Sequence, residues 1–246
     1  MRIDLKVPTS WGELDMDQFR VVASLMNENL TEEELLFCAF CRLAKIKARL
    51  MIPAIKRSGE DSDRWMRRFL TENGEEFFLQ DYEIAKFSGM LSWIIDKDAS
   101  HIGTPNPTSV GWTLDGISFG QWFYADAMFY RYGVSPHKIF IKKALRKLKS
   151  KPLRINANTV TMVLLWWRGV MERLAMLYPN VLQTGDADGE AQDPSQNWRN
   201  IMLMLNDDKP QENERIENAN VHDVLAALDS RIEKQKQLEQ MNKKSL

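Results

Sequence analysis

The most apolar stretch of the chain runs from Thr159 to Leu182, and its pattern predicts a long helix. Apolar side chains recur there at spacings of three and four residues, which places them on one helical face. The positions that share this face are Val160, Val163, Leu164, Trp167, Val170, Met171, Leu174, Leu177 and Tyr178. Because the residue before a proline disfavours the helical conformation, we expect this helix to end just before Pro179.

Further apolar residues make that face wider than an ordinary amphipathic stripe. They are Met162, Leu165, Trp166 and Met176. A helix that is apolar on most sides lies in a protein core, in a membrane or against a partner. Arg168, Glu172 and Arg173 stand mid-segment, and each would cost about 2.5 to 3.5 kcal/mol at the centre of a bilayer. We therefore expect a core helix or a partner-binding helix, and the pattern alone does not separate the two.

The amino-terminal hundred residues predict helices combined with a small sheet. Ile3, Leu5 and Val7 alternate with polar residues, which indicates a short half-buried strand. Ser10 with Glu13 has the spacing of a capping box, and a helical region follows through Asn27. A second box, Thr31 with Glu34, opens a helix that the apolar spacing extends from Glu32 to about Ile52.

A hairpin is predicted next. Runs typical of strands at residues 65–70 and 75–79 flank Asn73 and Gly74, and an Asn-Gly pair favours a type I′ turn. With the amino-terminal strand, this hairpin would complete a three-stranded antiparallel sheet. A helix from about Asp81 to Asp96 follows, with Gly89 in its interior.

The rest of the chain predicts further helices separated by breaks. Residues 101–116 form an irregular loop, which is the best internal boundary. A helix over 118–132 carries an aromatic face of Phe119, Phe123, Ala127 and Tyr130, and Pro136 starts another that runs to about Lys149. The acidic segment 183–197 predicts a flexible loop, and short helical patterns follow at 198–205 and from Val221.

The predicted fold class is therefore mainly α, with a small antiparallel β-sheet. We expect four regions: 1–100, 117–182, the acidic loop 183–197, and 198–246. A single compact domain overall is the alternative grouping. At 246 residues, the chain can bury a core without metal or disulfide support.

Composition excludes several classes of protein. The content of 44% apolar and 27% charged residues, with a formal net charge of -1, is that of a soluble globular protein with no global attraction to nucleic acid or membrane. The first residues lack a secretory pattern and there are only two cysteines, so we expect a cytoplasmic protein. Eight Trp and thirteen Met add weight to an interaction surface, although such residues are more often core.

Candidate catalytic chemistry is sparse. Cys38 and Cys41 have the spacing of a redox or metal pair, but both fall mid-helix and no second pair exists. His101, His137 and His222 are far apart in the sequence, and no glycine pattern has the setting of a phosphate-binding loop. We expect no cofactor, no metal and no enzymatic activity.

Charge is partitioned along the second half of the chain. No acidic residue lies between Asp126 and Glu172. The densest group of cations in that interval is Lys142, Lys143, Arg146, Lys147 and Lys149. This group predicts either a nucleic-acid footprint, a surface covered by the acidic segment that follows, or a solvated helix face.

The two ends of the chain resemble a family of phage proteins. The opening stretch Pro8–Leu14 (PTSWGEL), followed by a helix, is similar to the start of tail-gene products of Bacteroidetes prophages and tailed phages. The stretches Trp198–Ile201 and Asn220–Leu228, which lie on either side of Pro210, resemble the close of such proteins. The resemblance implies a chaperone-like or minor tail protein that acts in tail assembly and carries over no catalytic residue.

This resemblance implies protein partners, such as a tape-measure or tail tube component in the host cytoplasm. A chaperone-like role needs exposed aromatic and methionine side chains. The candidate partner-binding residues are Trp122, Phe123, Tyr130, Met162, Trp166 and Trp167. The alternative function is a nucleic-acid-binding protein of a mobile element that uses the basic group at 142–149.

Overall fold

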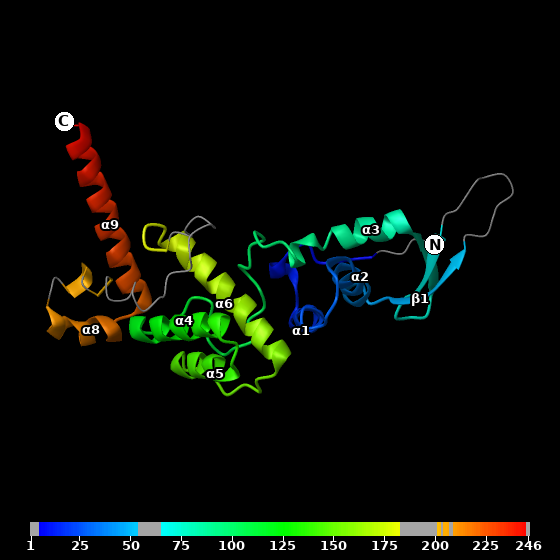
Figure 1. Ribbon diagram of the computed structural model, residues 1–246, viewed down its shortest axis with the longest axis horizontal. Coiled ribbons are helices and arrows are strands. Elements are labelled where there is room, and N and C mark those ends of the chain that lie inside the picture. Colours follow the sequence, from blue (N-terminus) through cyan, green and yellow to red (C-terminus); the bar gives the residue numbers. More distant parts are fainter. Residues whose placement is uncertain (1–4, 54–64, 183–200, 203, 207–208, 245–246) are drawn as a thin grey trace. The chain divides into compact units, whose positions relative to one another are not determined.

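The computed structural model of the chain describes residues 5–53, 65–182, 201–202, 204–206 and 209–244. Over these ranges the protein is mainly helical and has a small three-stranded antiparallel sheet, which confirms the predicted fold class (Figure 1). The chain divides into two compact units. The N-terminal unit is Met1–Pro105 with Ala157–Leu165, and the C-terminal unit is Asn106–Asn156 with Trp166–Leu246.

The N-terminal unit combines helices with the sheet. Its elements are η1 (Trp11–Glu13), α1 (Met16–Leu25), α2 (Glu32–Leu43), β1 (Lys47–Pro53), β2 (Trp65–Leu70), β3 (Glu76–Gln80), α3 (Asp81–Gly89) and η2 (Ser92–Ile94). The strands pair in the order β1-β2-β3, with Phe69 opposite Phe77. Phe40 of α2 packs edge-on against Phe69 and stacks on Phe87 at 5.3 Å, so α2, β2 and α3 share one core.

Local capping signals explain where the helices begin. The Thr31 hydroxyl accepts from the Glu34 N–H, and the Glu34 carboxylate accepts from the Thr31 N–H, which confirms the predicted capping box. The first predicted box is wrong, because Glu13 instead accepts from the N–H and hydroxyl of Thr9. Helix α1 begins at Met16, three residues after Glu13, and is capped by Asp15.

The hairpin is confirmed, but its turn differs from the predicted type. The Gly74 N–H donates to the Thr71 carbonyl, and the Thr71 N–H donates to the Glu75 carbonyl. Of the Asn73–Gly74 pair, only Gly74 takes a positive φ, at 80°. This pattern is a three-residue turn with glycine at the left-handed position, rather than a type I′ turn.

The third strand comes from a different segment than the sequence predicts. Leu5 and Val7 form no strand and lie half-buried against the core of the N-terminal unit, while residues 1–4 fall outside the described ranges. The third strand is β1, which the apolar spacing assigns to a long helix. That helix, α2, ends at Leu43, because Lys45 takes a left-handed conformation (φ 55°) and the chain turns to pair with β2.

Two further element boundaries differ from the prediction. Helix α3 ends at Gly89 and is followed by η2, so the predicted helix to Asp96 is interrupted. After α4 (Phe119–Val134), the next helix begins at Lys138 with the ring of His137 as its N-cap, so Pro136 precedes that helix and is not its first residue.

The C-terminal unit is built from helices. Its elements are α4 (Phe119–Val134), α5 (Lys138–Lys147), the part of α6 (Ala157–Leu177) from Trp166 onward, helical residues at 201–202 and 204–206, η3 (Pro210–Glu212), α8 (Asn213–Asn218) and α9 (Val221–Lys244). The predicted end of α6 before Pro179 is confirmed. The predicted acidic loop 183–197 lies outside the described residues.

Backbone pairing joins the starts of α4 and α9. The Phe119 N–H donates to the Ala219 carbonyl at 2.9 Å, and the Val221 N–H donates to the Ile117 carbonyl at 3.1 Å. Gly120 lies so close to α8 that an added Cβ would approach the Glu217 carbonyl oxygen to 3.2 Å. Glycine at this position therefore permits the close packing of α4 on α8.

Candidate functional site

Four of the six candidate partner-binding residues are buried. Trp166 has no exposed surface, and Trp122, Trp167 and Met162 are also buried. Phe123 and Tyr130 are half-buried. In this structure the four buried side chains are core, so they offer no surface to a partner.

The aromatic face of α4 points differently from the predicted one. Its buried positions are Phe119, Trp122, Ala125, Met128 and Phe129. The ring of Phe129 lies 4.7 Å from that of Trp167, and the Trp167 indole N–H donates to Asp126 Oδ1 at 3.2 Å. Burial raises the pKa of Asp126, and this hydrogen bond partly opposes the rise. Asp126 is thus a structural acceptor for a core tryptophan.

The cysteine pair behaves as part of the core of the N-terminal unit. Cys38 and Cys41 are both free thiols on α2, one half-buried and the other buried. Burial, together with Cys38, raises the pKa of the Cys41 thiol to about 12, and Arg67 only partly opposes this. A thiol that stays protonated at neutral pH is a poor nucleophile and a poor metal ligand.

The three histidines have separate structural roles. His101 is buried and stacks on Trp11 at 5.0 Å, and the His137 ring caps α5. His222 lies between the Tyr178 hydroxyl, 2.8 Å from its Nδ1, and the Thr113 carbonyl, which contacts its Nε2. Across the ranges that the structure describes, no group of His, Cys, Asp and Glu side chains is arranged to hold a metal.

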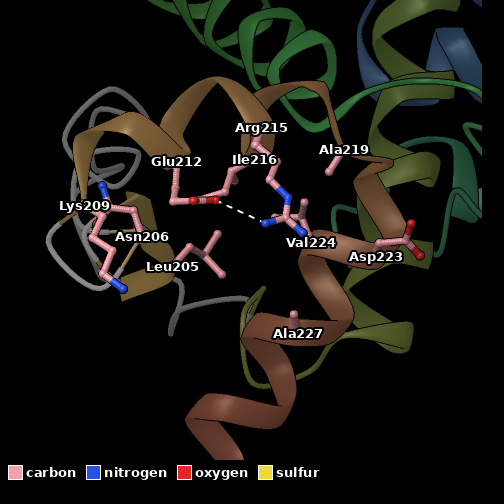
Figure 2. Close-up of a pocket in the computed structure, with 10 residues that line it drawn as sticks. All are labelled: Leu205, Asn206, Lys209, Glu212, Arg215, Ile216, Ala219, Asp223, Val224 and Ala227. Carbon is pink, nitrogen blue, oxygen red and sulfur yellow. Dashed lines mark hydrogen bonds and ion pairs between the residues drawn. The ribbon is translucent and has the colours of Figure 1, made fainter.

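A pocket in the C-terminal unit lies between α8, α9 and the residues around 205 (Figure 2). It has a volume of about 370 Å³. Its lining mixes both signs of charge, and Arg215 pairs with Glu212 at 3.3 Å across its mouth. Among the lining residues that the structure describes, no nucleophile stands beside a base.

The cation group at 142–149 forms one exposed surface on α5. We call Lys142, Lys143, Arg146, Lys147 and Lys149 the basic face; all five are exposed. The opposite side of the helix is buried through Ile141, Ala144 and Leu145, and α5 packs alongside α4 in Figure 1. The five cations thus lie together on one side of the helix end and face solvent.

Charge on the basic face is not neutralised within the described part of the chain. No described acidic side chain forms an ion pair with any of the five cations. Lys147 lies over the ring of Tyr124, 5.4 Å from its centroid, and Tyr124 is itself exposed. The acidic segment at 183–197, which the sequence offers as a cover, falls outside the described residues.

The basic face ends in a strained residue. Helix α5 closes with a Schellman motif, in which the Ser150 N–H donates to the Leu145 carbonyl and the Lys149 N–H to the Arg146 carbonyl. Lys149 therefore takes the left-handed position (φ 56°) that glycine prefers. Keeping a lysine there costs about 1 to 2 kcal/mol, and it adds one more cation to the face.

The surface features that the sequence did not indicate are exposed apolar side chains. In the C-terminal unit they include Met176, Leu177, Met204, Leu238 and Met241. A second feature is a groove between α2 and α3 in the N-terminal unit. Apolar periodicity predicts burial, so it could not reveal the apolar positions that remain exposed.

Comparisons with known proteins identified no relative of this chain. The chain matches no protein-family model, and searches of curated proteins and of solved structures found no match. Among the helices of the described ranges, none has both the length and the apolar content that a membrane span requires.

Proposed function

We propose that the protein binds nucleic acid through the basic face of α5, as a non-enzymatic binding protein of a mobile element. The observation that carries this proposal is five exposed cations on one helix end without a described acidic partner. Lys and Arg contacts to phosphates supply most of the affinity of sequence-independent binding. The neighbouring Tyr124 adds an exposed ring on which a base could stack.

Repulsion within the helix supports a role for these cations. Lys142 with Arg146 and Lys143 with Lys147 are like-charge pairs four residues apart, and each such pair destabilises a helix by about 0.2 to 0.5 kcal/mol. Lys149 adds the cost of its left-handed conformation. A bound polyanion would offset the repulsion and the backbone strain, whereas a face that contacts only water leaves both uncompensated.

Binding is tested by fluorescence anisotropy with a labelled duplex DNA at several salt concentrations. If all five cations contact phosphates, the logarithm of affinity should fall against the logarithm of salt with a slope of about 4.5. The double variant K142Q/K143Q should lower that slope by about 1.8, since each phosphate contact contributes about 0.9. K6Q/K86Q removes the same charge from exposed sites of the N-terminal unit and should leave the slope unchanged.

A matched pair of glycine variants separates binding from folding. Lys45 closes α2 in the same Schellman geometry as Lys149 closes α5. K149G and K45G should each stabilise the protein by about 1 kcal/mol, because glycine takes this conformation without strain. Only K149G should weaken DNA binding.

Two results would contradict the proposal. One is a salt response that is flat for the unmodified protein. The other is that polyglutamate, at equal charge concentration, displaces the labelled DNA as effectively as unlabelled DNA does. This would indicate that the basic face binds any polyanion.

A second candidate function is phage tail assembly, which the resemblance at the two chain ends implies. It is supported by exposed methionines and leucines, such as Met176 at 73% exposure, which suit binding of an apolar partner. The partner would be a tape-measure or tail tube component in the host cytoplasm. Affinity purification from phage-producing cells should recover such a component, and M176K should reduce that recovery; recovery of nucleic acid alone would favour the first proposal.

A further inference from the structure

A groove with an apolar floor runs between α2 and α3 in the N-terminal unit. It has a volume of about 520 Å³. Leu36 and Phe37 of α2 and Ile84 and Ala85 of α3 line it, and the guanidinium of Arg67 from β2 lies over the Phe37 ring at 4.9 Å. Apolar walls of this kind favour an apolar side chain as occupant.

The groove carries an excess of negative charge. Of the lining residues that the structure describes, Glu33, Glu34 and Asp81 are acidic and only Arg67 is basic. Hydrogen bonds from Thr31 lower the pKa of Glu34, so that carboxylate stays ionised at neutral pH. The fitting occupant is therefore an apolar segment flanked by lysines.

The second half of α9 is a segment of that chemistry. From Glu233 to Asn242 its side chains are exposed, and Figure 1 shows this half extending past the other elements of the C-terminal unit. Leu238 and Met241 are 62% and 65% exposed, and with Lys234 they recur at helical spacing on one face. Over residues 233–244 the sequence has four lysines against two glutamates.

Such a helix end is marginal by itself. About three turns of helix, residues 233–244, lie beyond the half-buried Ile232, and helices of this length are barely stable in water without packing. A mostly polar helix that carries two exposed apolar residues on one face is typical of a segment that binds in an apolar groove.

We propose that the groove between α2 and α3 receives the second half of α9 from a second copy of this chain. Leu238 enters the apolar floor beside Phe37 and Ile84, and Lys234, which shares the face of Leu238, lies against the acidic rim. The contact joins two different surfaces, so each copy offers one groove and one α9 end. This self-association goes beyond the nucleic-acid proposal and does not depend on it.

The test is sedimentation velocity of the full chain over a range of concentrations, with two variants. Leu238→Asp should weaken association at least about tenfold, since burial of one leucine is worth at least that factor. Ala85→Arg, which blocks the groove and adds a repelling cation, should do the same. V134K changes an exposed apolar residue of the C-terminal unit outside both surfaces and serves as the control that should associate normally.

Mixing the two variants decides between this contact and any other. L238D keeps an intact groove and A85R keeps an intact α9, so each alone should be monomeric while their mixture forms a heterodimer. All the altered residues are exposed, so unchanged circular dichroism and Tm should accompany these results. A monomeric unmodified protein, an A85R variant that still self-associates, or a mixture that stays monomeric would each overturn the proposal.

Discussion

Replacing Trp166 with alanine tests whether the apolar helix α6 is core or interface. Trp166 has no exposed surface and lies 6.3 Å from the ring of Trp112 and 5.9 Å from that of Trp167. The substitution removes an entire indole from this cluster. Its neighbours are themselves large rings held by their own packing, so they cannot collapse fully into the space.

The expected cost is large on the scale of protein stability. Truncation of a buried tryptophan to alanine lowers the free energy of unfolding by about 3 to 5 kcal/mol. Domains are stable by only about 5 to 15 kcal/mol in total. For a unit of this size, each kcal/mol lowers Tm by about 3 °C, so W166A should melt about 10 °C or more below the unmodified protein.

The assay is urea denaturation followed by circular dichroism, with W166F as the matched control. Phenylalanine keeps most of the ring and removes the Trp166 indole N–H, which is buried without a hydrogen-bond partner among the described residues. W166F should therefore cost less than about 1.5 kcal/mol. A loss below about 1 kcal/mol for W166A would refute the core assignment and return Trp166 to the list of interface candidates.

Substitutions at two other positions, Thr31 and Asp126, have clear expected outcomes. T31A should lower the free energy of unfolding by about 0.5 to 2 kcal/mol in urea denaturation, because α2 loses its capping box. D126N should raise Tm at pH 7. Burial raises the pKa of Asp126 in the folded protein above the value of about 3.9 that it has in the unfolded chain. The unmodified protein therefore loses stability as the pH rises from about 3.9 through the pKa of the folded state, and asparagine, which carries no charge, avoids this loss. This advantage should vanish near pH 4, and D126A should be about 1 to 3 kcal/mol less stable than D126N because the Trp167 N–H loses its acceptor.

Sequence rules succeeded where the determinants are local. The Thr31–Glu34 box and the end of α6 before Pro179 each depend on a few neighbouring residues, and the structure has both. The Gly74 hairpin was also predicted, although its turn type was wrong. A type I′ turn needs two positive φ angles, and the three-residue turn observed needs only one, at Gly74.

Strand β1 could not be predicted because its cause is tertiary. Lys47–Pro53 contains Ala, Leu and Met, which favour helix, and it continues the apolar spacing of α2. The structure ends α2 at a left-handed lysine and pairs the segment with β2, so backbone groups on one side of β1 find partners in β2. Pairing with a partner some twenty residues away outweighs a propensity difference of a few tenths of a kcal/mol per residue.

Whether a candidate site could be predicted likewise depends on whether its cause is local in the sequence or tertiary. The basic face could be predicted because the absence of acids between Asp126 and Glu172 is a property of the sequence itself. The aromatic candidates could not be resolved, because Trp166 and Trp167 are adjacent in sequence and both are buried. Two adjacent helical residues differ by 100° in direction, so this outcome requires packing on two sides of α6, which no periodicity reveals.

The net charge of -1 is a poor guide to what the basic face can bind. At physiological salt, the interaction between exposed charges is largely screened beyond about 8 Å. Helix α5, with ten residues, is about 15 Å long, so a phosphate chain that contacts it lies within the screening distance of its cations. Raising the salt concentration should therefore abolish nucleic-acid binding through the basic face. Lowering the salt concentration should strengthen that binding, although the net charge of the protein is close to zero.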